Sequence, residues 1–288
     1  MLSITPIASG SRGNCILIRS DQATVLVDIG IPLFYVEGAL EKLSVRPCDV
    51  DAVFITHEHT DHINGVQAFA AKYATPVYMH GAAAEGAARK LKKVPPHKIA
   101  EFGDNDFFFK DMTVSPFNVS HDVHCTGYSF LCGGEKVSML TDAGAVEDSS
   151  LKRIADSDVV LIEANHDVDM LKSSKKYPAM LKRRILSPFG HLSNADSGAA
   201  VTKLALGGVC RQFILAHLSM ENNYPELAFA AVKGALKAQN IECGKDIFLS
   251  VAEQYKIGAP VTAGCVTDTA EAEWSVKNVK NLVKQNAL

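Results

Sequence analysis

The sequence lacks the features that would place this chain in a membrane or in an oxidising compartment. No run approaches the ~18 apolar residues of a membrane span, and residues 1–20 have no basic segment leading into an apolar one. The 7 cysteines are odd in number and scattered, without a C-x-x-C pair, which argues against a disulfide framework and against a cysteine-rich zinc site. We therefore expect a cytoplasmic protein with no signal peptide and no membrane contact.

The chain also lacks a strong charge of either sign. Its formal net charge of −3 argues against a broad basic face, so any polyanionic substrate must be held locally. One segment, 171–190, carries cations without any acidic residue, and these are Lys172, Lys175, Lys176, Lys182, Arg183 and Arg184. We expect a loop that grips phosphates here, with Lys182, Arg183 and Arg184 binding substrate, whereas a merely solvated loop is the alternative.

A run of three histidines and one aspartate, spaced H-x-H-x-D-H over residues 57–62, is the most informative motif that is present. The apolar run 51–56 predicts a buried strand, so the alternation of a strand would point His57 and His59 toward one metal ion. Asp61 and His62 begin a predicted helix, displaced enough to reach a second metal ion. A polar turn that happens to be rich in histidine is the alternative, but the spacing favours a metal site.

Five further polar residues each end or follow an apolar run that predicts a strand. These are Asp28, His121, Asp142, Glu163 and His217. Any one of them could be a cap or a surface group. Taken together they indicate a shared site, because strand ends are rigid and the segments beyond them converge. With 47% hydrophobic residues among 288, the chain can bury one large core around such a site.

These motifs resemble the metallo-β-lactamase superfamily. Within it, residues 8–15, 163–167, 183–187, 190–194 and 216–219 resemble the YycJ/WalJ group of bacterial proteins, and the resemblance covers about residues 1 to 256. It implies an α/β (α+β) fold, a four-layer αββα sandwich with two sheets face to face and helices outside. It also implies a two-metal hydrolase site along one edge, with phosphodiesterase or exonuclease chemistry on nucleic acid, DNA being favoured over RNA.

The resemblance also implies two sets of metal ligands. His57, His59 and His121 would hold one ion, Asp61, His62 and His217 the other, and Asp142 would bridge them. A bridging carboxylate suits two divalent ions ~3.5–4 Å apart, which share a water that is deprotonated near neutral pH. Imidazole and carboxylate ligands suit Zn or Mn, and the sequence does not choose between them. Asp28 matches a carboxylate that orients a ligand histidine, with a strand-end cap as the alternative.

The general acid follows from a second likeness. His191, in a Gly-His-Leu-Ser run, resembles the histidine of ribonuclease Z that donates a proton to the departing oxygen, and Glu163 resembles the glutamate that orients it. The catalytic residues that we expect are thus His191, Glu163 and the ligand Asp61. Arg12, in the glycine-bearing turn 9–14, is a further candidate for phosphate contact, although a tight turn explains it equally well.

The domain organisation and the rival activities stay open at this point. We expect a hydrolase domain over 1–258, followed by a C-terminal segment over 259–288. This segment would consist of a linker at 259–264 and a short helix at about 267–284 that packs on the domain or on a second subunit as a homodimer. A phosphodiesterase for small, cyclic phosphates, as in PhnP-like enzymes, is the nearest rival, and the cationic segment favours a polymer over it. A thioester or lactam hydrolase is disfavoured by His191 and Glu163.

Overall fold

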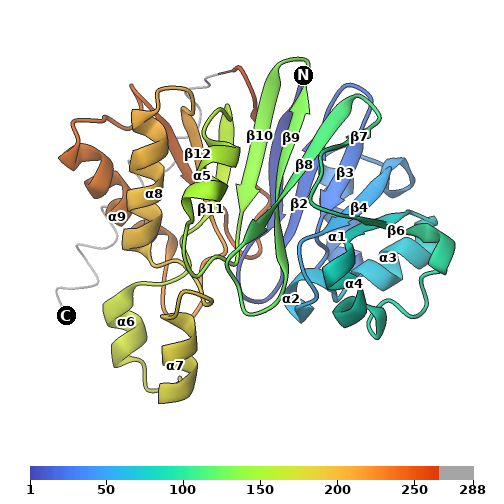
Figure 1. The fold of residues 1–288 in the computed structure, drawn as a ribbon, viewed down its shortest axis with the longest axis horizontal. Coiled ribbons are helices and arrows are strands. Elements are labelled where there is room, and N and C mark those ends of the chain that lie inside the picture. The colour runs from blue at the N-terminus through green and yellow to red at the C-terminus, as the bar shows by residue number, and fades with distance from the viewer. Residues whose placement is uncertain (266–288) are drawn as a thin grey trace.

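Two β-sheets lie face to face, and helices cover the outer face of each sheet (Figure 1). The computed structural model describes residues 1–265. In each sheet, antiparallel strands on one side give way to parallel strands on the other. None of the helices in the described part of the chain combines the length and apolar content needed to span a bilayer.

The first sheet has seven strands in the order β14-β1-β2-β3-β4-β5-β6. They are Ser3–Ala8 (β1), Cys15–Arg19 (β2), Thr24–Val27 (β3), Ala52–Ile55 (β4), Val77–His80 (β5), Ile99–Phe102 (β6) and Val261–Thr262 (β14). The helices of this half are Leu33–Lys42 (α1), Thr60–Ile63 (α2), Val66–Tyr73 (α3) and Gly81–Ala88 (α4), with short 3-10 turns at Pro47–Asp49 (η1) and Pro96–Lys98 (η2).

The second sheet also has seven strands, in the order β13-β12-β11-β10-β9-β8-β7. They are Phe107–Phe109 (β7), Met112–Val119 (β8), Cys125–Cys132 (β9), Glu135–Leu140 (β10), Val159–Glu163 (β11), Gln212–Ala216 (β12) and Phe248–Val251 (β13). Its helices are Asp148–Ile154 (α5), Val168–Ser173 (α6), Ala179–Ile185 (α7), Asn194–Leu206 (α8) and Pro225–Ala238 (α9).

The alternation of side chains along each strand explains why the layers form. In β4, Val53 and Ile55 are buried against α1 and α3, whereas Phe54 points the other way into the space between the sheets. A strand buried on both faces reads as one continuous apolar run, which is what the parallel strands show. The described residues thus contain an apolar core between the sheets and one beneath the helices of each half. The expected four-layer sandwich is confirmed.

Residues 259–264, predicted to be a linker, contain a strand instead. Val261 and Thr262 pair antiparallel with Ile4 and Ser3, so β14 covers the exposed edge of β1. Edge strands have unpaired backbone groups that recruit a neighbour, and such long-range pairing leaves no periodic signal in a two-residue strand. The helix predicted over 267–284 lies outside the described residues, and the domain boundary after residue 258 stays a prediction.

The cationic segment was predicted to be a loop, but the structure has two short helices here: α6 ends at Ser173, and α7 spans Ala179–Ile185. Residues 174–178, which include Lys175 and Lys176, form the connection between them. Figure 1 shows them at the lower end of the view, where α2 also lies. Asp167 caps α6 by accepting hydrogen bonds from the backbone of Asp169 and Met170. Leu171 and Ile185 are buried and anchor the helices to the body. We call this pair the basic hairpin.

Phe54 and Phe108 offer a matched test of the core. Phe54 is fully buried among the rings of both sheets, whereas Phe108 on the edge strand β7 is 86% exposed. We predict that Phe54→Ala lowers the free energy of unfolding by about 3–5 kcal/mol, and that Phe108→Ala changes it by less than about 0.5 kcal/mol. Equilibrium urea denaturation measures both, and similar losses would contradict the proposed layering.

Candidate metal centre

Side chains of the types that can bind metals gather where several strands of both sheets end. Their ligand atoms form four overlapping groups, within each of which all atoms lie within 4.8 Å of one another. The members are His57, His59, Asp61, His62, His121, Asp142, Glu163, His191 and His217. The first sheet supplies the H-x-H-x-D-H run after β4, and the second sheet supplies residues that end or follow β8, β10, β11 and β12. The predicted residues therefore lie together, from segments far apart in the sequence.

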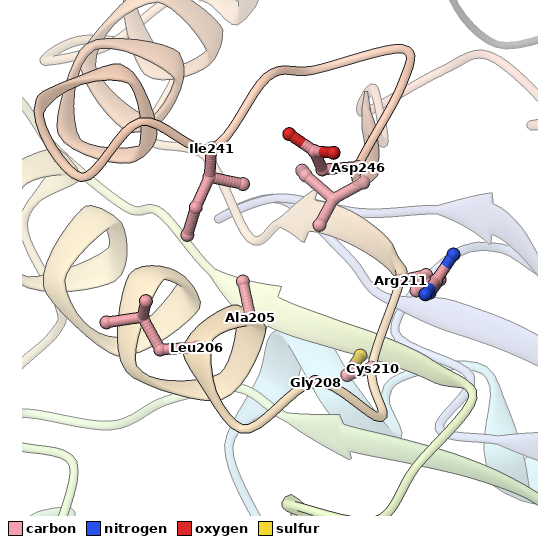
Figure 2. Close-up of a pocket in the computed structure, with 8 residues that line it drawn as sticks. Ala205, Leu206, Gly208, Cys210, Arg211, Ile241 and Asp246 are labelled. Carbon is pink, nitrogen blue, oxygen red and sulfur yellow. The ribbon is translucent and has the colours of Figure 1, made fainter.

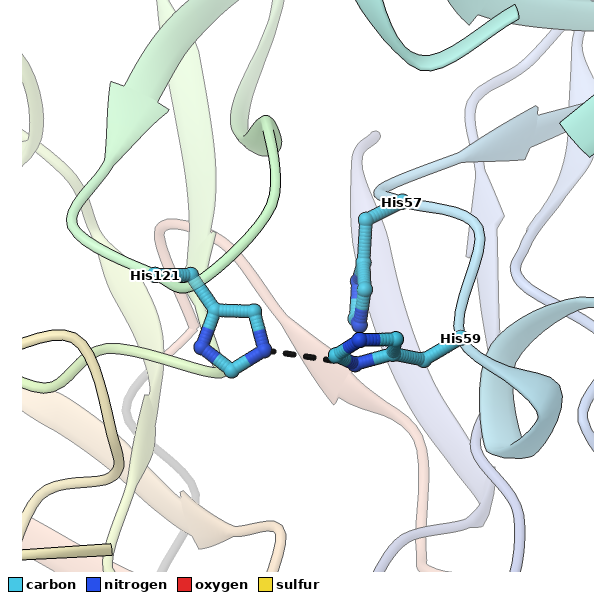
Figure 3. A group of neighbouring side chains, drawn as sticks. All are labelled: His57, His59 and His121. Atoms are coloured by element: carbon cyan, nitrogen blue, oxygen red, sulfur yellow. Dashed lines mark hydrogen bonds between the residues drawn. The ribbon is translucent and has the colours of Figure 1, made fainter. Parts of the chain in front are cut away.

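The first group joins His57, His59 and His121 (Figure 3). His121 Nε2 lies 3.3 Å from His59 Nδ1, and the buried His57 Nε2 has no hydrogen-bond partner. The predicted convergence of His57 and His59 is present, but our reason for it was wrong. Because β4 ends at Ile55, the turn beyond the strand brings the two rings together, not the pleat of the strand.

The second group joins Asp61, His62 and His217. Asp61 Oδ2 lies 3.6 Å from His62 Nε2 and 3.5 Å from His217 Nε2. His217 Nε2 is buried without a hydrogen-bond partner. Asp142 lies between the groups: its Oδ2 is 3.2 Å from His62 Nε2, and its Oδ1 is 4.0 Å from His121 Nε2. This placement suits the predicted bridging position.

Three of the residues at strand ends adopt a left-handed backbone. Asp28 and Asp142 have φ near +60°, and His217 has φ +57°. Such a conformation costs of order 1–3 kcal/mol in a residue other than glycine and persists only where the surroundings enforce it. Here it turns three polar side chains toward the same cluster as each strand ends.

Hydrogen bonds to Nδ1 fix the orientation of three imidazoles. In each of them Nδ1 is the donor. His62 donates to Asp28 Oδ2 (2.7 Å), His217 donates to Glu163 Oε1 (2.7 Å), and His121 donates to the Gly190 carbonyl (3.2 Å). A neutral imidazole that donates from Nδ1 has its lone pair on Nε2. All three Nε2 atoms therefore face the cluster as potential metal ligands. Fixing the tautomer in this way is typical of histidines that bind metals.

Some contacts involve residues that the sequence did not single out. Thr56 donates its backbone N–H and its hydroxyl to Asp28, at 2.9 and 2.8 Å, and its oxygen lies 3.0 Å from His57 Nδ1. Asn14 donates its backbone N–H to the Asp61 carbonyl at 2.8 Å. Asp122 Oδ1 lies 3.3 Å from His121 Nε2. Thr56 directly precedes His57, and Asp122 directly follows His121. This proximity to a predicted ligand is the one sequence signal that could have identified them.

The electrostatics of the cluster favour a bound cation. Burial opposes a charge on Asp142, yet His217, His62 and His57 hold the pKa of its carboxyl well below the usual range. Burial also opposes a charge on His62, yet Asp142, Asp28 and Asp61 hold the pKa of its imidazole well above the usual value. Without metal, protons on imidazoles compensate the buried carboxylates. The orphaned ligand atoms and the charge balance both fit divalent metal ions in this place.

Within the cluster, Glu163 connects the candidate ligand His217 to His191. Its Oε1 accepts hydrogen bonds from Nδ1 of both His217 (2.7 Å) and His191 (2.9 Å). Its Oε2 accepts from the backbone N–H groups of Ala143 (2.7 Å) and Leu192 (3.3 Å). Burial lowers the pKa of the His191 imidazole, but the neighbouring Glu163 carboxylate raises it, and the net pKa lies above the usual value. Glu163 is fully buried, whereas the His191 side chain stays 21% exposed, so its ring can meet a molecule from solvent.

The predicted substrate-binding cations differ in their contacts. Arg184 forms an ion pair with Asp122, directly beside the candidate ligands. Lys182 instead donates to the Lys172 carbonyl at the end of α6, at 2.7 Å. Arg183 is exposed on α7. Arg12 is exposed in the turn after β1, where its backbone N–H donates to Gln254 Oε1 at 2.9 Å.

A surface pocket lies at the opposite end of β12 from His217 (Figure 2). It is lined by Ala205, Leu206, Gly208, Cys210, Arg211, Ile241, Asp246 and Ile247. None of these belongs to the cluster of candidate ligands, so this pocket is separate from the candidate metal centre.

Comparisons with known proteins agree with the motifs. The family model of the metallo-beta-lactamase superfamily matches residues 8–191. Exodeoxyribonuclease WalJ of Streptococcus pneumoniae is 37% identical over 245 residues, which are 83% of this chain and 90% of that protein. Exodeoxyribonuclease YycJ of Bacillus anthracis is 33% identical over 246 residues, 85% of this chain and 92% of that protein. The solved structure of the metallo-beta-lactamase fold protein YhfI from Bacillus subtilis matches with a TM-score of 0.66 at 18% identity, over 91% of this chain and 100% of that one.

Asp28→Asn tests the carboxylate that orients His62. The amide keeps the shape but removes the charge that holds the imidazole, so we predict ~10–100-fold weaker metal binding. Competition with a chromophoric chelator measures the affinity. Asp148→Asn is the matched control, because Asp148 is an exposed carboxylate that pairs with Lys203 on the surface. Equal affinities for both variants and the parent protein would refute the orienting role.

Proposed function

The chain belongs to the metallo-beta-lactamase superfamily, and from that premise we propose that it is a metal-dependent exodeoxyribonuclease. One observation carries the proposal. Glu163 binds Nδ1 of His217 on one side and Nδ1 of His191 on the other, so it couples a candidate metal ligand to a candidate proton donor. Hydrolysis of a phosphodiester requires both, because it expels a poorly stabilised alkoxide.

We propose that the centre holds two divalent ions, Zn or Mn. His57, His59 and His121 would bind one ion, Asp61, His62 and His217 the other, and Asp142 both. The charge balance supports two ions instead of one. Four carboxylates bring four negative charges, which two divalent cations would match; they belong to Asp28, Asp61, Asp142 and Glu163. When bound, such ions lower the pKa of a water molecule and polarise a phosphoryl oxygen.

The remaining steps fall to the side chains of this chain. With Nδ1–H donated to Glu163, the opposite nitrogen of His191 is directed to the exposed side of the centre, where it can protonate the departing oxygen. Glu163 is the positioning residue for this step. A thioester hydrolase has less need of such a donor, since the thiolate that it expels is better stabilised than an alkoxide.

The basic hairpin supports a polymeric substrate. Arg184 reaches the centre through Asp122, and Lys175 and Arg183 are exposed on the same hairpin. We propose that these cations bind the phosphates that flank the scissile one, with DNA as the substrate. The free cysteines of residues 1–265 fit a reducing compartment, and we propose the cytoplasm.

Activity assays test the function directly. The purified protein, loaded with Mn or Zn, is assayed on bis-p-nitrophenyl phosphate, end-labelled duplex DNA, circular DNA and RNA. We expect stepwise release of nucleotides from DNA ends, no cut in the circle, and loss of activity in a chelator. Hydrolysis of the small diester alone would favour the small-molecule phosphodiesterase, and lack of hydrolysis of any phosphodiester would overturn the proposal.

His191→Ala tests the proton donor. We predict that the variant keeps its metal but cleaves DNA ~10²–10⁴-fold more slowly, because the departing oxygen is no longer protonated. The loss should shrink on bis-p-nitrophenyl phosphate, whose leaving group needs little protonation. His97→Ala, in an exposed turn, is the control. An equal loss on both substrates would assign His191 a binding or structural role.

Arg183 and Arg184 test the basic hairpin. Each phosphate contact contributes about −0.9 to the slope of log affinity against log salt, so we predict that replacing both with Ala flattens the slope for duplex DNA and raises KM. The loss should be larger for DNA than for a small diester. Arg211 and Lys245, exposed cations at the opposite end of the molecule, form the control pair. A salt slope that is unchanged would exclude the hairpin from the binding surface.

A further inference from the structure

Three aromatic rings lie side by side on the surface. Phe34 and Tyr35 begin α1, and Tyr255 follows β13. Their exposed fractions are 66%, 49% and 60%. The ring centroids of Phe34 and Tyr35 are 4.4 Å apart, and those of Tyr35 and Tyr255 are 6.3 Å apart. Clustered exposed rings contrast with singly scattered surface apolar residues, and they mark a binding surface. We call this cluster the aromatic platform.

The segments that carry the platform also support the metal centre. Gln254, next to Tyr255, donates its side-chain N–H to the Gly13 carbonyl at 2.7 Å. Gly13 is pressed against Ile31, where an added Cβ would lie 2.7 Å from Cγ2, and its φ is +151°. The next residue, Asn14, donates its backbone N–H to the carbonyl of the candidate ligand Asp61 at 2.8 Å.

The same turn also contacts the other sheet. Ser9 Oγ accepts a hydrogen bond from the backbone N–H of His217 at 2.8 Å, and Ser9 donates its own N–H to the Glu253 carbonyl at 3.3 Å. Gly30, just before α1, packs against the backbone of Asp61 in the H-x-H-x-D-H motif. An added Cβ at Gly30 would lie 1.7 Å from the Asp61 carbonyl oxygen, so the start of α1 also contacts the motif. The segments that carry the aromatic platform therefore contact the turn 9–14 and the motif that hold Asp61 and His217.

Charge favours a nucleic acid on this surface. Arg12 is exposed in the turn that Gln254 holds. Glu253, the nearest acid along the chain to Tyr255, is paired with Lys256 at 3.0 Å. Exposed rings beside an arginine are the elements that bind single strands, because every base has a face that can stack and the backbone needs a cation. A paired duplex keeps its bases stacked on one another and cannot offer these faces.

We propose that Phe34, Tyr35 and Tyr255 stack with unpaired nucleobases of the DNA strand whose phosphodiester lies in the metal centre, and that Arg12 contacts its backbone. The inference rests on the proposed function and adds to it. The substrate is a single strand or a frayed end, held by its bases on one side of the centre. The basic hairpin would hold phosphates independently of this platform.

An abasic scan tests the platform in the full-length protein. Oligonucleotides that lack one base, at successive positions from the end, are titrated by fluorescence anisotropy with the parent protein and with a Phe34→Ala/Tyr35→Ala/Tyr255→Ala variant. In the parent, we expect a few adjacent abasic positions to weaken binding by about fivefold or more each. In the triple variant, the intact strand should bind at least about tenfold more weakly and the scan should be flat.

Two further variants separate stacking from folding. Tyr35→Phe/Tyr255→Phe keeps the rings and should keep the positional pattern, whereas Phe108→Ala removes an exposed ring at the far end of β8 and should also keep it. For cleavage of single strands, the triple variant should raise KM far more than it lowers kcat. A flat scan in the parent protein, or the same pattern in the triple variant, would overturn the platform.

The outcomes also distinguish this inference from the function on which it rests. If the parent cleaves DNA but its scan is flat, the platform fails and the nuclease stands. If the parent cleaves no DNA, the nuclease proposal fails, whatever the scan shows. Sedimentation of the parent and the triple variant provides the last check. A dimer that becomes a monomer in the variant, with a flat scan in the parent, would assign the rings to contact with a second copy of the chain.

Discussion

Negative charge that is withdrawn from water is the constraint on which the rest of this structure depends. Asp28, Asp142 and Glu163 are buried, and the side chain of Asp61 is 28% exposed. A carboxylate removed from water is costly unless hydrogen bonds and cations compensate it. Imidazoles supply the hydrogen bonds here, and they direct their free nitrogens inward as they do so. The hydrogen bonds that offset the cost of burying the carboxylates thus also orient a set of potential metal ligands. The negative charge that remains favours binding of cations.

The fold supplies this cluster from two directions. The first sheet contributes the H-x-H-x-D-H run just beyond β4, and the second sheet contributes residues at the ends of four of its strands. Neither sheet has the full set, so the centre depends on the packing of one sheet against the other around buried residues such as Phe54. Left-handed residues at strand ends concentrate backbone strain where the ligands converge. Stability of the core and geometry of the site are therefore linked.

Much of this could be predicted from the sequence, because the relevant signals are local. Apolar runs predicted the strands and helices, and the spacing of His57 to His62 predicted the gathering of ligands. What failed depends on contacts between distant segments. The pairing of β14 with β1 and the hydrogen bonds that Thr56 and Asn14 donate to Asp28 and Asp61 appear only once the chain has folded. The helices α6 and α7 were missed for a different reason, since they are only 6 and 7 residues long and give little periodic signal. The aromatic platform likewise could not be predicted, because it brings together rings from α1 and from the segment after β13, which lie far apart in the sequence.

The number of metal ions bound per chain measures whether the negative charge of the centre is balanced by metal. Four carboxylates lie at the centre, and two divalent ions per chain would balance their charge. The protein is loaded with Zn or Mn, freed of excess by gel filtration, and analysed by mass spectrometry against protein concentration. We predict about two ions per chain in the parent protein and a clear loss in Asp142→Ala. Clearly fewer than one ion per chain in the parent, or an undiminished content in the variant, would contradict a metal centre built on these carboxylates.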